Sequence, residues 1–144
     1  MDIRLIETTL SEYEQMKQLR WTVLLNPIGV PASYIDPERE KNDLLVAAFE
    51  GEQMIGCCIL SKRDEKKLQV RQMAVDTKCQ GTGVGTAIIV YCEEVAKERG
   101  FEVLMMHSRD VVIPFYEKCG YSIVSEQFFE VGIAHHVMEK VLVD

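Results

Sequence analysis

Glycines at short, fixed spacing form the segment of this chain that is best suited to chemistry. The segment runs Gln80-Gly-Thr-Gly-Val-Gly-Thr86 and follows an apolar stretch that ends at Val75. A strand that leads into a glycine-rich helix start is suited to binding phosphate, because small residues let the backbone approach the ligand. The first N–H groups of the helix have no partners inside it, and the helix dipole adds positive potential there. The alternative is a tight strand-to-helix turn with packing glycines.

The spacing of the glycines excludes two common phosphate-binding patterns. The Walker pattern requires Gly-Lys-Ser/Thr, but Gly85 is followed by Thr86 and Ala87. The dinucleotide fingerprint requires a third glycine three residues after the second, where this chain has Thr86 or Ile88. The pattern that fits is Gln-x-x-Gly-x-Gly. It resembles the pyrophosphate loop of the GNAT acetyltransferase superfamily, which binds acetyl-coenzyme A.

A second motif supports the same resemblance. The segment Pro114-Phe-Tyr-Glu-Lys-Cys-Gly-Tyr121 is similar to the Phe-Tyr-x-Lys-x-Gly-Phe/Tyr segment of that superfamily. The tail Gly132-Ile-Ala-His-His136 resembles the Gly-Ile-Pro-His segment of one bacterial branch, with Ala134 in place of the proline. Leu19-Arg20 and Pro27-x-Gly-x-Pro31 also resemble that branch.

The resemblance implies acetyl-CoA as cosubstrate. Backbone N–H groups of the glycine segment would hold its pyrophosphate. These residues are Gln80, Gly81, Thr82, Gly83, Val84, Gly85 and Thr86. Met73, Ala74 and Val75 would pair with the pantetheine amides, and an N–H there would stabilise the negative charge that develops on the carbonyl oxygen. No metal is expected, because the histidines lack the spacing of a zinc site.

The implied reaction moves an acetyl group from a thioester to a primary amine. A lysine-like amine has a pKa of about 10.4, so only about one molecule in 10³ is neutral at pH 7. The enzyme must desolvate the amine or supply a base. The leaving thiolate must then take a proton. Tyr116 matches the tyrosine that the superfamily uses as general acid, and its alternative role is a core aromatic on a short helix.

The three histidines are the candidates for the base. His135 matches the branch motif and is chosen, with a structural histidine as the alternative. Adjacent residues in a strand face opposite sides, so at most one of His135 and His136 points into a cleft. His107 ends a predicted buried strand near the expected acetyl site. Glu130 and Asp36 are further candidates for holding a cationic amine.

Hydrophobic periodicity and turn signals predict a single domain over residues 1–144. Strands are expected at residues 2–5, 44–49, 54–60, 68–75, 102–106, 121–124 and 133–143. Helices are expected after Ser11, whose spacing to Glu14 is that of a capping box, and at residues 83–99 and 114–119. This order predicts an α/β (α+β) protein with a mixed sheet flanked by helices. It resembles the GNAT-like acyl-CoA N-acyltransferase fold, whose sheet is mostly antiparallel.

Composition narrows the class of partner and the compartment. The net charge of −7 argues against nucleic-acid binding, which requires a basic face. Five cysteines without a Cys-x-x-Cys pair argue against a disulfide framework and favour the reducing cytoplasm. The N-terminus alternates apolar and charged residues, as a strand does and a signal peptide does not. No apolar run approaches membrane-spanning length, so no membrane contact is expected.

The resulting interpretation is a cytoplasmic N-acetyltransferase that acetylates a primary amine of a small molecule or peptide. One alternative is a non-catalytic acyl-CoA-binding sensor, which would retain the glycine segment without needing Tyr116. Another is a structural interaction domain, which tight coenzyme A binding would exclude. Because relatives in the superfamily pair through their last strands, the resemblance also implies a homodimer.

Overall fold

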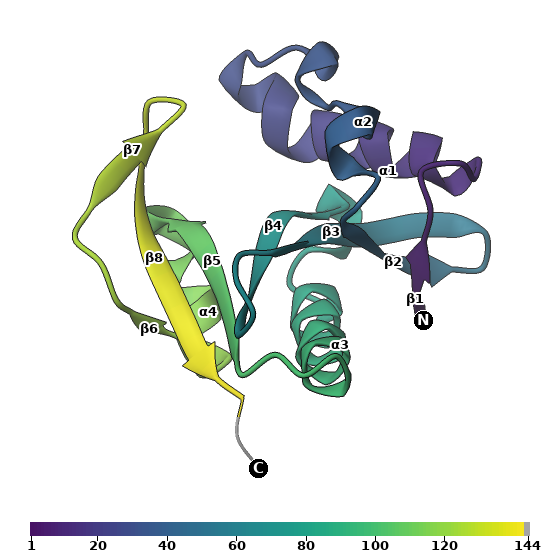
Figure 1. Cartoon of the computed structure of the whole chain (residues 1–144). Coiled ribbons are helices and arrows are strands. Elements are labelled where there is room, and N and C mark those ends of the chain that lie inside the picture. The colour runs from purple at the N-terminus through teal and green to yellow at the C-terminus, as the bar shows by residue number, and fades with distance from the viewer. Residues whose placement is uncertain (143–144) are drawn as a thin grey trace.

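In the computed structural model, which describes residues 1–142, eight strands form one sheet (Figure 1). The strand order is β1-β2-β3-β4-β5-β8-β6, and β7 pairs with β8. The strands are β1 (Asp2–Ile6), β2 (Leu44–Glu50), β3 (Gln53–Lys62), β4 (Lys67–Val75), β5 (Val103–Arg109), β6 (Ser122–Ile123), β7 (Phe128–Glu130) and β8 (Ile133–Val141). Within residues 1–142, only β4 and β5 pair in parallel, which confirms the predicted mixed, mostly antiparallel sheet.

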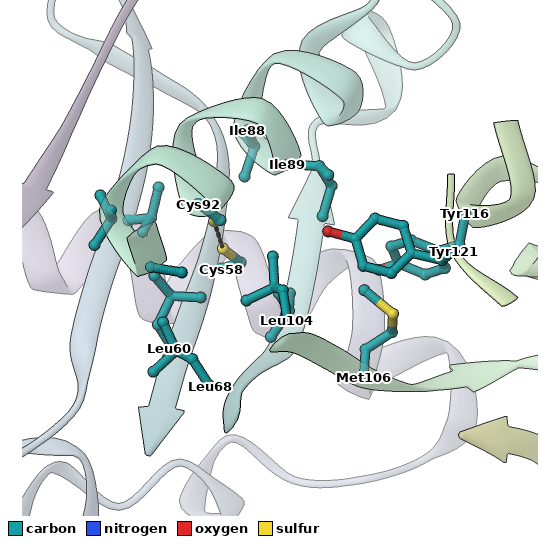
Figure 2. Close-up of a cluster of buried hydrophobic side chains, with 14 of the residues drawn as sticks. Cys58, Leu60, Leu68, Ile88, Ile89, Cys92, Leu104, Met106, Tyr116 and Tyr121 are labelled. Carbon is teal, nitrogen blue, oxygen red and sulfur yellow. Dashed lines mark hydrogen bonds between the residues drawn. The ribbon is translucent and has the colours of Figure 1, made fainter. Parts of the chain in front are cut away.

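Helices cover both faces of this sheet (Figure 1). They are α1 (Glu12–Arg20), α2 (Pro37–Glu40), α3 (Val84–Glu98) and α4 (Ile113–Lys118). One buried cluster joins the sheet to α3 and α4, and Figure 2 shows part of it. A second cluster joins the opposite face to α1. The sheet therefore separates two surfaces, called here the α3 face and the α1 face.

Three local features differ from the prediction. Ser11 has helical φ and ψ of −60° and −26° and makes no side-chain cap bond, so the predicted capping box is wrong. A cap needs an extended backbone, whereas here a turn from Leu10 already leads into the helix. Strand β7 was not predicted. The last predicted strand ends at Val141, and residues 143–144 lie outside the described part of the chain.

Strands β4 and β5 separate before either strand ends. Their parallel pairing runs from Lys67 opposite Val103 to Val70 opposite Met106. Strand β4 then continues to Val75 and β5 to Arg109. This segment, called here the splay, leaves the facing edges of the two strands unpaired with each other and so offers backbone N–H and C=O groups to a ligand.

A bulge in β4 lies inside the splay. The register with β3 shifts between Cys57, opposite Ala74, and Ile59, opposite Arg71. Within this interval Gln72 has a φ of +49°, which is unusual for a residue other than glycine. A bulge bends its strand and increases the local twist, so it accounts for the divergence of β4 from β5.

Candidate active site

The glycine segment forms a turn at the start of α3. Gly81 and Gly83 have φ values of +81° and +91°, a region that glycine enters without steric cost. Gly83 precedes the first helical residue, and no side chain caps the helix. Gln80 Nε2 donates to the Val75 carbonyl oxygen at 3.0 Å and so ties the turn to the end of β4. The first N–H groups of α3 therefore lie beside the splay, where an anion can accept hydrogen bonds from them.

The two sequence motifs meet at Gly85 and Phe115. A Cβ atom placed on Gly85 would lie 3.1 Å from Phe115 Cζ, so α3 approaches α4 closely only because residue 85 has no side chain. Phe115 precedes Tyr116 in α4. The glycine segment and the helix that carries Tyr116 are therefore in contact.

Met73, Ala74 and Val75 form the β4 edge of the splay. Ala74 is buried in the cluster on the α1 face, whereas Met73 and Val75 pack against the cluster on the α3 face. Their backbone therefore passes between the two faces beside the start of α3. Their pairing with a pantetheine chain stays a prediction.

Tyr116 is buried between α4 and the sheet, with 7% of its surface exposed. Its ring makes edge-to-face contacts with Phe115 and Tyr121, with centroids 5.1 and 6.0 Å apart. Figure 2 shows its hydroxyl directed toward Ile89 of α3. Burial raises the pKa of Tyr116 above its ordinary value, and nearby thiols such as Cys58 add to the rise.

The Tyr116 hydroxyl donates to no other side chain or carbonyl within residues 1–142. In this part of the chain, every side-chain oxygen or nitrogen that is fully buried has a hydrogen-bond partner. Because the Tyr116 oxygen has no partner, it is not fully buried and keeps a small accessible area. The hydroxyl is thus protonated and has no hydrogen-bond partner within residues 1–142. Its role as an acid stays a prediction.

The three histidines divide between the two faces of the sheet. His136 shares a face with Met138, which belongs to the cluster under α3 and α4, and its Nδ1 lies 2.7 Å from Asp110. His135 points to the opposite face, as strand alternation predicts. Met106 belongs to the cluster on the α3 face. Because side chains alternate along a strand, the next residue, His107, also lies on the α1 face.

A cluster on the α1 face contains His107, Phe128, Glu130 and His135. His107 Nδ1 lies 2.5 Å from Glu130 Oε1, and His135 Nε2 lies 4.0 Å from Glu130 Oε2. The Phe128 ring stacks on His135 and meets His107 edge-on, with centroids 5.8 and 5.2 Å apart. This group, called here the histidine cluster, is assembled from β5, β7 and β8.

His135 and His107 differ in their access to a substrate. The His135 side chain is 7% exposed, and its Nδ1 donates to the Ile133 carbonyl oxygen at 2.7 Å. The His107 side chain is 23% exposed. The motif selects His135, but His107 is the more open of the two. Sequence analysis noted His107 and Glu130 separately and did not pair them.

A buried ion pair lies beneath the β4 bulge and was missed by sequence analysis. Arg20 donates to the two Glu40 carboxylate oxygens at 2.8 and 2.7 Å and to the Gln72 side-chain oxygen at 2.9 and 2.7 Å. Tyr13 also donates to Glu40, at 2.8 Å. Burial alone would raise the Glu40 pKa, but Arg20 outweighs it and holds that pKa below its usual value.

Asp36 has a structural role at the start of α2. Its carboxylate accepts a hydrogen bond from the Glu38 N–H at 3.0 Å, as an N-cap residue does. This engagement makes Asp36 a weaker candidate for binding an amine. Within residues 1–142, no group of three or more histidine, cysteine, aspartate or glutamate side chains could hold a metal ion. In the same range, no helix is long and apolar enough to cross a membrane.

Residues 10–142 match the family described as "Acetyltransferase (GNAT) domain". The chain is 28% identical over 131 residues to the uncharacterized N-acetyltransferase YjcF of Bacillus subtilis, covering 88% of this chain and 93% of the relative.

Two solved structures share the fold. The first is an aminoglycoside 6′-N-acetyltransferase complexed with coenzyme A, with a TM-score of 0.85, 17% identity and coverage of 100% of this chain and 98% of that one. The second is a GNAT family acetyltransferase from Elizabethkingia anophelis with acetyl-CoA bound, with a TM-score of 0.76, 18% identity and coverage of 98% and 97%.

Proposed function

The chain belongs to the GNAT family and is an acetyl-CoA-dependent N-acetyltransferase, and on this basis we propose that it acetylates a primary amine of a small molecule or peptide by direct attack. Tyr116 is the general acid in this proposal. The residues Met73 to Val75 and Gln80 to Thr86 bind acetyl-CoA. Measuring turnover across a panel of amines identifies the acceptor.

The contact between Gly85 and Phe115 carries the proposal. It brings the uncapped start of α3 and the helix of Tyr116 together beside the splay. A pyrophosphate on the N–H groups of α3 would leave the pantetheine chain to enter the splay between β4 and β5. The thioester would then lie between the two strands, near the Tyr116 side of α4.

The chemistry follows from where charge develops. When the amine attacks, the carbonyl oxygen gains negative charge, and an N–H on the β4 edge can stabilise it. The departing thiolate needs a proton or a hydrogen bond, and the unpaired Tyr116 hydroxyl can supply either. Because burial raises the Tyr116 pKa, full transfer of its proton to a thiolate is unfavourable. As general acid, Tyr116 therefore acts through a hydrogen bond that strengthens as the C–S bond breaks, and water supplies the proton that completes the thiol.

The proton of the attacking amine goes to the histidine cluster on the α1 face. His135, selected by the branch motif, belongs to it. In this proposal the cosubstrate approaches from the start of α3 and the acceptor approaches from the opposite, α1 face, beside the helix that covers part of that face. The cluster lies on that face.

A non-catalytic acyl-CoA sensor is the competing function. It would need the glycine segment but neither an unpaired tyrosine hydroxyl nor histidines on the opposite face. Both features are present, and they favour the enzyme.

The test is acetyl-CoA turnover with a free-thiol readout, across polyamines, amino sugars, amino acids, aminoglycosides and peptides. Tyr116→Phe is measured beside wild type, with Tyr121→Phe as the matched control. The background from Cys79 and Cys119, which are partly exposed, is subtracted. Turnover on one amine class that falls in Tyr116→Phe alone supports the proposal. Calorimetric binding of acetyl-CoA without turnover on any amine supports the sensor.

A homodimer formed through the last strands and a cytoplasmic location are part of the same proposal. Apolar side chains are exposed on and beside these strands: Ile123, Val124, Phe129, Val131 and Val141. All five cysteines are free thiols, in keeping with a reducing compartment. Light scattering at several protein concentrations tests the dimer, and a monomer at all of them rejects it.

A further inference from the structure

We propose that His107 is the base that takes the proton of the attacking amine, with its proton-accepting nitrogen set by Glu130. The inference rests on the proposed N-acetyltransferase activity and names a catalytic residue for it. The geometry of the histidine cluster favours His107 as the base, whereas the sequence motif favours His135.

The place of His107 in the sheet is the first support. Met106 is the last β5 residue paired with β4, so His107 is the first residue of β5 inside the splay. Leu104 and Met106 point into the core under α3 and α4. By alternation, His107 points to the α1 face. Its side chain therefore lies at the inner end of the splay, on the face that the proposed function assigns to the acceptor.

The contact with Glu130 fixes the tautomer. An ionised carboxylate can only accept hydrogen bonds, so the His107 Nδ1 atom, 2.5 Å from Glu130 Oε1, carries the proton and donates it. In the neutral imidazole, Nε2 then has the free lone pair. A histidine held in this way by a carboxylate is the arrangement that prepares an imidazole to accept a proton.

The direction of the ring follows from the strand order. Glu130 lies on β7, which pairs with β8, and β8 flanks β5 on the side away from β4. The two ring nitrogens point in diverging directions. Nδ1 is directed at Glu130 on β7, away from β4, and Nε2 is the nitrogen left free to accept a proton.

His135 is a positioning residue in this arrangement. Its Nδ1 is held by the Ile133 carbonyl oxygen and its Nε2 faces Glu130 at 4.0 Å. Phe128 packs between the two histidines. His135 thus lies beside the His107–Glu130 pair and shares the Phe128 ring with His107. Removal of His135 should therefore loosen the pair without removing the base.

The proton balance of the step is complete. The amine nitrogen forms a bond to the carbonyl carbon and gives one proton to His107 Nε2. The C–S bond breaks while Tyr116 donates a hydrogen bond to the sulfur, and the departing thiolate takes a proton from water. His107 then gives its proton to water, which replaces the proton that the thiolate took. The products are the N-acetyl amine and the free thiol, and no other reactant is needed.

The experiment measures kcat/KM with the best amine of the panel and saturating acetyl-CoA. Wild type is compared with His107→Gln, His107→Ala, Glu130→Gln and a control, His136→Gln, which lies on the other face. We expect His107→Gln to lose about 10²–10⁴-fold in kcat/KM, the usual contribution of a general base. Added imidazole should partly restore His107→Ala. Glu130→Gln should lose less, and His136→Gln should keep wild-type activity.

The pH profile separates a chemical role from a structural one. The groups around His107 are Glu130 on β7, His135 on β8, and, on the same face, Arg109 of its own strand and Arg71 of β4. A general base accepts the amine proton only in its unprotonated form, so kcat/KM of the wild-type protein should rise with pH. This rise should be absent in His107→Gln.

The outcomes are distinguishable. Calorimetric affinity for acetyl-CoA and the thermal midpoint should be unchanged in His107→Gln, which shows that the variant is folded. If both His107 variants keep the kcat/KM and the pH profile of the wild-type protein, this inference is wrong and the proposed function is unaffected. The inference is also wrong if the rise of kcat/KM with pH disappears in His135→Gln and is unchanged in His107→Gln. Absence of turnover by the wild-type protein overturns the proposed function, and this inference with it.

Discussion

Arg20 donates two hydrogen bonds to the side-chain oxygen of Gln72, the residue with positive φ in the β4 bulge. Arg20 is fully buried, and its Nη1 and Nη2 atoms also donate to the two Glu40 carboxylate oxygens. The bulge that opens the splay is therefore held from the α1 face by a buried ion pair. This connects the position of α1 and α2 to the geometry of the strand edge at which acetyl-CoA is proposed to bind.

Replacing Arg20 should be among the most destabilising single changes in the chain. Arg20→Met leaves the Glu40 carboxylate buried without its partner, which typically costs about 3–5 kcal/mol. Urea unfolding measures the loss. Lys17→Met is the matched control, because Lys17 pairs with Glu14 at the surface, where such pairs contribute about 0–1 kcal/mol. Equal losses in the two variants would show that the buried pair does not hold the fold.

The same pair predicts how stability depends on pH. Although burial opposes it, Arg20 keeps the Glu40 pKa below its usual value in the folded state. Glu40 therefore binds a proton more readily when unfolded, and its stabilising contribution is present above the unfolded pKa. That contribution is lost as pH falls through the folded pKa.

Wild type should consequently lose stability on acidification more steeply than Glu40→Gln. Urea unfolding at a series of acidic pH values measures both proteins, and the difference between their free energies of unfolding should shrink as pH falls. A difference independent of pH would mean that Glu40 does not titrate with folding.

Gly56 should control how closely α3 approaches the sheet. A Cβ atom on Gly56 would lie 2.8 Å from Ile88 Cδ1 and 2.9 Å from Val84 Cγ1. Gly56→Ala must therefore push the first turn of α3 outward, at a cost of about 1–3 kcal/mol. Because Val84 begins α3, acetyl-CoA should also bind more weakly.

Calorimetry and urea unfolding check the two effects of this change. Gly51→Asn is the control, since nothing lies within 4 Å of its Cβ position and asparagine tolerates its φ of +59°. If Gly56→Ala binds acetyl-CoA with wild-type affinity, the position of the first turn of α3 does not control cosubstrate binding.

Much of the fold could be predicted because its signals are local. The apolar stripe of α3 and the turn at Gly51 specify their elements without help from the rest of the chain. Strand β7 was missed because it is short and its turn to β8 is Val131-Gly132. Both turn residues have positive φ, which a valine does not suggest.

The site was only partly predictable for a similar reason. The glycine segment is contiguous in sequence, so its spacing is visible. The pairs His107–Glu130 and Arg20–Gln72 join residues that are 23 and 52 positions apart. Only the register of β5, β7 and β8 brings the first pair together, and only the bulge brings the second. Neither register nor bulge leaves a local signal at these residues.

Thiol reactivity should divide the five cysteines into two classes. Cys57, Cys58 and Cys92 are buried, whereas Cys79 and Cys119 are partly exposed. Burial raises the pKa of Cys57 to about 12, and the contact with Cys92 Sγ at 3.4 Å, together with burial, raises the pKa of Cys58 well above its ordinary value. Since the thiolate is the reactive form, Ellman's reagent should label only the two exposed thiols in the native protein. All five should react in urea, and rapid native labelling of all five would contradict the buried cluster.

Tyr116 and Tyr121 should separate catalysis from stability. The rings are neighbours, but the Tyr121 hydroxyl donates to Glu93 at 2.8 Å, whereas the Tyr116 hydroxyl has no partner within residues 1–142. Tyr121→Phe removes a hydrogen bond to a charged group and should cost about 1.5–3 kcal/mol of unfolding free energy. Tyr116→Phe removes an unpartnered hydroxyl, so stability should be unchanged or higher while kcat falls. Urea unfolding and steady-state kinetics on the same preparations test both statements. A loss of stability in Tyr116→Phe without a loss of kcat would assign Tyr116 to the core.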